Sequence, residues 1–162
     1  MKLNHENLAR YDLLFTCNRN FCKEFSGNIV VDLINEKCTI LMSEITLLEI
    51  LAKGAKYVAS SLLRAERVIK GIRSLLYDDR VHKIPIHDTY VLLTALELRK
   101  LLNDFIDCLI LSATINYANI LLTGDEDIHR LLGNEKFLEI VQEINPEFKI
   151  MCYSELEKIL SE

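Results

Sequence analysis

Proline and glycine are scarce in this sequence, with two and five residues among 162, and tryptophan is absent. The chain also has no low-complexity stretch and no internal repeat. Because linkers between domains are usually rich in proline, glycine or polar residues, nothing marks a domain boundary. Half of the residues are apolar, which is enough for a full hydrophobic core. We therefore expect a single domain over residues 1–162, with its core from about residue 13 to residue 160.

Long hydrophobic runs are missing as well. The apolar runs, such as residues 40–42 and 120–122, are far shorter than the roughly 20 apolar residues that a membrane-spanning helix needs. Residues 1–11 lack the apolar region of a signal peptide. We expect a cytoplasmic protein with no membrane partner.

The patterns of a zinc site are also absent. The five cysteines form no C-x-x-C pair, and the four histidines show no H-x-x-x-H spacing. Most of the cysteines lie in apolar segments, so we expect reduced, buried thiols. Any metal ion in this protein would be held by oxygen ligands.

Positive charge is in the minority, with 19 basic against 24 acidic residues and a formal net charge of −5. This balance argues against non-specific electrostatic adhesion to nucleic acid. An enzyme acting on nucleic acid would need a local basic surface, or a cation that its carboxylates hold facing the phosphates.

One basic stripe is a weak candidate for such an RNA-binding surface. Arg64, Arg67, Lys70 and Arg73 recur at every third residue of an expected helix. A three-residue step drifts by about 60° per repeat around a helix, so the four residues spiral around it. A solvated helix face is the stronger interpretation.

Short apolar segments alternate with helical patterns along the chain. The expected strands are residues 13–16, 38–42, 119–123 and 148–152. The expected helices are a stretch to about residue 35, residues 44–76 as a hairpin with a break near Gly54, and residues 89–102, 105–117, 126–132 and 135–144, followed by a terminal helix. Short apolar strands separated by helices predict an α/β fold with a parallel sheet covered on both faces. Sites in such folds lie at the carboxyl ends of the strands.

Two carboxylates stand in strongly apolar helical segments. Glu49 follows the second expected strand, and a surface pair with Lys53, four residues on, is the simple alternative to a site. Asp107 lies in the first turn of a helix so apolar that the carboxylate must be largely buried. A charge that complements the helix dipole is its simple alternative, although Asp104 could fill that role at the surface.

Two further carboxylates, Asp125 and Asp127, follow the strand that ends at Thr123. Either could cap the next helix, and capping alone explains one of them. In a parallel sheet these aspartates, Glu49 and Asp107 would converge on one edge and raise each other's pKa unless a cation neutralised them. Mg²⁺ or Mn²⁺ is the expected occupant.

Residues 13–160 resemble the PIN-domain family of VapC-like ribonucleases. Residues 107–114 are similar to the family's third acidic residue and its buried helix, and residues 123–127 to its T-x-D turn. Residues 43–49 are similar to the segment that carries the second acidic residue, which corresponds to Glu49. The resemblance implies a three-layer α/β domain with a central parallel sheet flanked by helices.

The first motif departs from the family pattern. Family members have an aspartate after the first apolar strand, and this chain has Thr16, followed by Cys17 and Asn18. Asp12 cannot take the same place, since four strand residues span about 13 Å. A register with Asp12 in the motif would leave residues 7–11, which are poorly apolar, as its strand.

The resemblance implies a metal-dependent endoribonuclease that hydrolyses RNA phosphodiester bonds. Its metal and catalytic residues would be Glu49, Asp107 and Asp125, with Asp127 as a peripheral metal ligand and with Thr16, Asn18 and Thr123 in support. Many small relatives are toxins of toxin–antitoxin pairs, so an antitoxin protein and a second copy of the chain are expected partners beside RNA.

Two alternatives stay open at this point. The threonine at position 16 could mark a degenerate PIN domain that binds RNA or protein without cutting. An all-helical regulator would require the four apolar runs to be helical.

Overall fold

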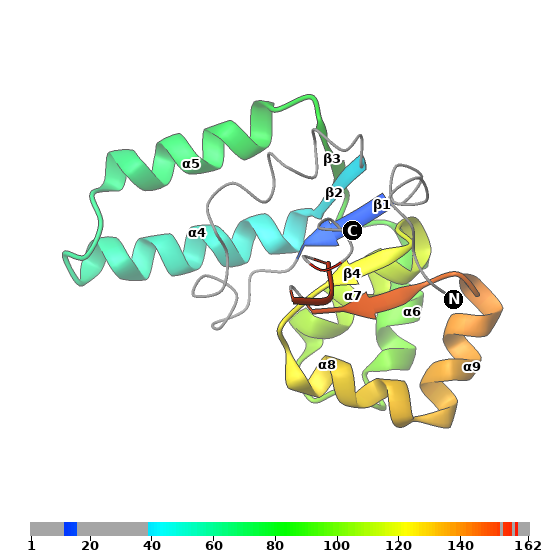
Figure 1. The fold of residues 1–162 in the computed structure, drawn as a ribbon. Helices are drawn as coiled ribbons and strands as arrows, with labels where there is room; N and C mark the ends of the chain where they lie inside the picture. The colour runs from blue at the N-terminus through cyan, green and yellow to red at the C-terminus, as the bar shows by residue number, and fades with distance from the viewer. Residues whose placement is uncertain (1–11, 16–38, 153, 157, 159–162) are drawn as a thin grey trace.

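A single parallel sheet organises the molecule, and the computed structural model describes it over residues 12–15, 39–152, 154–156 and 158 (Figure 1). Its strands are β1 (Asp12–Phe15), β2 (Thr39–Ser43), β3 (Val81–Ile84), β4 (Ile120–Leu122) and β5 (Lys149–Met151). Their order in the sheet is β3-β2-β1-β4-β5, and every neighbouring pair is parallel. The expected α/β class is confirmed, and an all-helical protein is excluded.

Helices connect the strands. They are α4 (Glu44–Ala59), α5 (Ala65–Tyr77), α6 (Thr89–Leu98), α7 (Phe105–Tyr117), α8 (Glu126–Arg130), the 3₁₀ turn η1 (Leu131–Gly133) and α9 (Glu135–Ile144). Helices α4 and α5 form a hairpin that extends away from the sheet (Figure 1). None of the described helices is long and apolar enough to cross a membrane.

The core lies around α7. Eight consecutive residues of this helix, from Cys108 to Ile115, are buried. A helix that is apolar on all sides must be covered on all sides, and α7 contacts β1, β4, α6 and α9. Burial of this helix fixes its first turn, which carries Asp107, against the sheet.

Several expected boundaries were wrong. The expected break near Gly54 does not occur, because α4 continues to Ala59 and the turn follows at residues 60–64, where Ser61 has φ of 59°. Strand β3 was missed because it is short and only its two terminal residues are buried. The helix that begins at Thr89 ends at Leu98 instead of residue 102. The helix expected up to residue 35 lies outside the described residues.

Candidate active site

The carboxyl end of β2 passes directly into α4. Ser43 is both the last residue of the strand and the N-cap of the helix, where its Oγ accepts a hydrogen bond from Ile45 N at 3.3 Å. Glu44 Oε2 accepts another from Ile86 N at 3.0 Å, which ties the segment after β3 to the same place. These contacts place Glu49, in the second turn of α4, near the carboxyl edge of the sheet.

The turn after β4 is held by backbone and hydroxyl contacts. The amide of Thr123, which is buried, donates to the carbonyl of Met151 at 3.0 Å. Its Oγ1 accepts from the amide of Asp125 at 3.1 Å. His129 Nε2 lies 3.0 Å from the carbonyl oxygen of Thr123, to which it can donate. Thr123 therefore acts here as the anchor of the turn.

Asp125 and Asp127 differ in their surroundings. Asp125 caps α8, and its Oδ1 accepts from the amides of Asp127 at 2.8 Å and Ile128 at 3.4 Å. Asp127 is exposed and pairs with Arg130, whose Nη1 lies 2.7 Å from Oδ1. Capping therefore accounts for Asp125, and a surface ion pair accounts for Asp127.

Asp107 is the electrostatic centre of this region. The pKa of its carboxyl group is raised to about 6, mainly by burial and then by the nearby negative charges of Asp104, Asp125, Glu49 and Asp127, in that order of importance. The other three expected carboxylates therefore all act on Asp107 at the start of α7. Concentrated negative charge of this kind is a common feature of functional sites.

Glu49 shows both of the properties considered for it. Its carboxylate lies 3.9 Å from Nζ of Lys53, as the surface-pair interpretation predicts. Burial nevertheless raises the pKa of Glu49, while Lys53 lowers it and Asp104 raises it. Since α4 also contacts α7, Glu49 belongs to the same group of carboxylates as Asp107.

Two residues of this region were missed in the sequence. Asp104 was considered only as a surface charge, yet it is the charged neighbour that acts most strongly on Asp107. Thr46, in the first turn of α4, is 1% exposed, and its Oγ1 has no hydrogen-bond partner in the described part of the chain. The sequence did contain a signal for both residues. Asp104 lies three residues before Asp107, and Thr46 three residues before Glu49, and residues at this spacing lie on the same side of a helix.

The other expected site residues that the structure describes are not part of this group. Arg67, Lys70 and Arg73 are exposed on α5, and Arg64 is the exposed N-cap of that helix. Thr16 and Asn18 lie outside the described residues. Asp12 is the first residue of β1 and pairs with Thr39, at the amino end of the strand.

The donor set suits a hard divalent cation in part. Carboxylate oxygens are the ligands that Mg²⁺ and Mn²⁺ prefer, and the buried, unpartnered hydroxyl of Thr46 would accept a polar contact. Among the described side chains, however, no three Asp, Glu, His or Cys residues are grouped closely enough to hold one ion. The ligand chemistry of these carboxylates fits a hard cation, but the described side chains do not by themselves form a complete site for one.

Comparisons with known proteins settle the family. The PIN domain family model matches residues 13–133, which is most of the chain. This chain belongs to the PIN-domain family. The matched range contains Glu49, Asp104, Asp107, Asp125 and Asp127.

A solved structure shares the fold of this PIN domain. It is a chain from the crystal structure of VapBC2 from Rickettsia felis bound to a DNA fragment from their promoter. The similarity has a TM-score of 0.56 at 19% identity and covers 88% of this chain and 98% of the other. No curated protein matches the sequence. The expected PIN fold, a three-layer arrangement with a central parallel sheet, is confirmed.

Proposed function

We propose that this PIN-domain protein is a metal-dependent endoribonuclease that hydrolyses RNA phosphodiester bonds, acting as one domain over residues 1–162. The observation that carries the proposal is the group of carboxylates around Asp107, where burial of this side chain and the charges of its neighbours together raise its pKa to about 6. Such repulsion has a cost that a bound cation would remove. The family membership supports the reaction class.

The chain's own residues would then divide the work. Glu49, Asp107 and Asp125 would hold Mg²⁺ or Mn²⁺ directly or through water, with Asp127 as a peripheral contributor. When bound, such a cation lowers the pKa of a water molecule and offsets charge on the phosphate. Thr123 would keep the turn of Asp125 in place through its hydrogen bond to that amide. Thr16 and Asn18 would support the site from the segment that follows β1.

The proposed biological setting is a toxin–antitoxin pair in the cytoplasm, with this chain as the toxin. The likeness to a chain of the VapBC2 complex supports an antitoxin protein as partner. A homodimer is proposed on the same resemblance. RNA would be the substrate, with Arg64, Arg67, Lys70 and Arg73 as weak candidates for backbone contacts.

A degenerate PIN domain that binds RNA or protein without cutting is the second candidate. The specific observation in its favour is Thr16, a neutral residue where the family has an aspartate. One charged ligand fewer would weaken the affinity for a hard cation.

Cleavage of a generic single-stranded RNA separates the two candidates. The parent should cut in Mn²⁺ or Mg²⁺ and stop on addition of EDTA, and Asp107→Asn should be inactive while remaining folded. Asp79→Asn, which changes an exposed carboxylate on the turn before β3, is the control and should keep full activity. RNA binding with no metal-dependent cleavage at any ion concentration would favour the degenerate domain.

A further inference from the structure

A groove runs between α6 and α9, and none of its described lining residues is among the carboxylates that act on Asp107. Its volume is about 500 Å³, and its apolar lining comes from Leu93 and Leu96 of α6 and Ile140 and Ile144 of α9. Both helices contact α7. We call this feature the α6–α9 groove.

The outer surface of α6 is unusually apolar. Its buried residues, among them Val91 and Leu98, already pack toward the core. Leu93 and Leu96 nevertheless remain 58% and 59% exposed. A surface helix needs only one apolar face to pack on the core, but α6 has a second apolar face that is exposed. Exposed apolar patches of this kind mark contact sites for other proteins.

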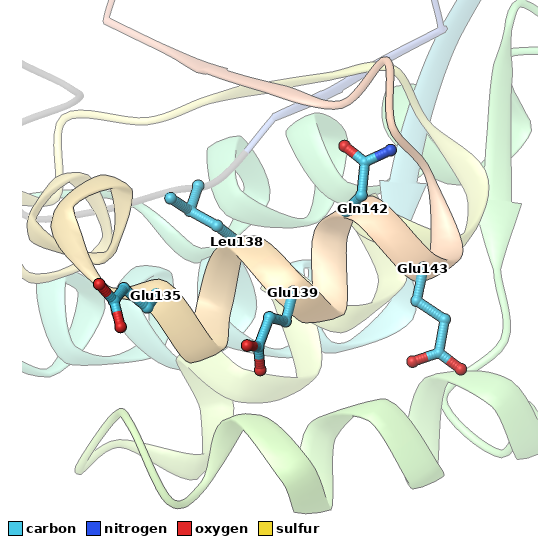
Figure 2. A pocket seen from close by; sticks show the side chains of 5 residues that line it. All are labelled: Glu135, Leu138, Glu139, Gln142 and Glu143. Carbon is cyan, nitrogen blue, oxygen red and sulfur yellow. The ribbon is translucent and has the colours of Figure 1, made fainter.

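Carboxylates border the apolar lining. Glu97 and Glu143 line the groove itself, and Lys100 is the single basic residue in its described lining. A second hollow continues along α9, and its charged lining residues are Glu135, Glu139 and Glu143 (Figure 2). In Figure 2, Glu139 and Glu143 extend from one side of the helix, and Leu138 and Gln142 from another. The described lining of the two hollows therefore contains four carboxylates and one ammonium group.

This charge distribution selects the kind of partner. A second copy docking through the same face would place carboxylates opposite carboxylates, and RNA phosphates would be repelled too. Lysine or arginine beside an apolar stripe would complement the groove. A groove between two helices suits the apolar side of a third helix, whose contacts recur every three or four residues.

We propose that the α6–α9 groove docks a basic amphipathic helix of a partner protein. Leu93, Leu96, Ile140 and Ile144 would take its apolar side chains, and the glutamates along α9 would face its lysines or arginines. The proposal is independent of catalysis at Asp107.

Two synthetic helical peptides of about five turns provide the probe. Both carry leucine along one face, and the remaining positions are mainly lysine in one and mainly glutamate in the other. Fluorescence anisotropy with the full-length protein should show binding of the lysine peptide and little binding of the glutamate peptide. The double variant Leu93→Ser/Leu96→Ser should lower the affinity for the lysine peptide by about tenfold or more.

Charge reversal supplies a gain-of-function arm. Glu139→Lys/Glu143→Lys should weaken binding of the lysine peptide and should allow the glutamate peptide to bind. Leu62→Ser/Glu66→Lys, which makes the same kinds of change at exposed positions near the tip of the α4–α5 hairpin, is the control and should bind like the parent. Circular dichroism and RNA cleavage should be unchanged in all three variants.

Three results would overturn the proposal. Equal binding of both peptides, or binding that survives Leu93→Ser/Leu96→Ser, would show that the groove is not the docking site. Sedimentation showing a dimer that Leu96→Asp converts to monomers would assign the face to a second copy of the chain.

Discussion

Gly54 of α4 faces Val68 of α5 so closely that a Cβ atom added to the glycine would lie 2.5 Å from Cγ1 of the valine. Gly54 is buried, and its lack of a side chain lets the two helices of the hairpin approach each other at this point. The valine cannot easily move away, since β-branched side chains have one strongly preferred rotamer in helices. This glycine is therefore a packing residue and not a helix break.

Gly54→Ala should destabilise the protein by about 1–3 kcal/mol, because the added methyl group overpacks the hairpin. Urea unfolding followed by circular dichroism measures the loss. Gly71→Ala on α5 is the matched control: nothing lies within 4 Å of the added Cβ, so the change should be neutral or stabilise by up to about 1 kcal/mol. Val68→Ala should restore part of the loss in the double variant. Equal stability of Gly54→Ala and the parent would contradict this packing.

Asp107 should make the metal-free protein more stable as the pH falls from about 7 to 5. Its pKa is about 6 in the folded state against an ordinary value of 3.8. In this window the folded state binds the proton more tightly, so protonation removes a destabilising charge. Asp107→Asn should lose this part of the pH dependence in EDTA and should melt at the parent's temperature or higher at pH 7. Asp79→Asn should keep the parent's profile. A variant Asp107→Asn that unfolds would instead make Asp107 a structural residue.

Asp125 should separate helix capping from cation binding. Asp125→Asn keeps an oxygen for the amides of α8 and should retain stability without metal, while Mn²⁺ binding measured by calorimetry should weaken. Asp125→Ala should also lower the free energy of unfolding by about 1 kcal/mol, because it removes the helix cap. Asp88→Asn, at the N-cap of α6, is the control because Asp88 is not among the carboxylates that act on Asp107. Unchanged Mn²⁺ affinity in Asp125→Asn would remove this residue from the site.

Thr16→Asp should strengthen Mn²⁺ binding and create or increase RNA cleavage, because it supplies the carboxylate that the family has after its first strand. Mn²⁺ should raise the variant's free energy of unfolding by RT ln(1 + [L]/Kd), and its melting temperature should rise accordingly. Without metal, the variant should be less stable than the parent. The parent, by contrast, should bind Mn²⁺ only weakly. If Thr16→Asp gains neither stability nor cleavage, and Asp12→Asn abolishes activity in the parent, Asp12 is the first ligand.

The sequence was sufficient for the fold class because the buried strands and α7 are continuously apolar, and such segments have few alternatives to a covered parallel sheet. It was insufficient at Gly54, where a contact with Val68, distant along the chain, keeps the glycine within a helix. Strand β3 was missed because a four-residue edge strand has little periodicity. Within the candidate site, the effect of Asp104 on Asp107 was missed, because the sequence alone does not distinguish an aspartate that only caps a helix from one that also lies close to Asp107.

The direct passage from β2 into α4 at Ser43 leaves no linker to absorb movement between the sheet and the hairpin. A partner that tilted the hairpin would therefore have to change backbone torsion angles next to Ser43, less than two turns from Glu49. Movement of the hairpin would therefore be coupled to the position of a candidate metal ligand. If a partner changed the affinity for the cation by moving the hairpin, the cation would change the affinity for that partner by the same factor, because coupling between two binding sites is reciprocal.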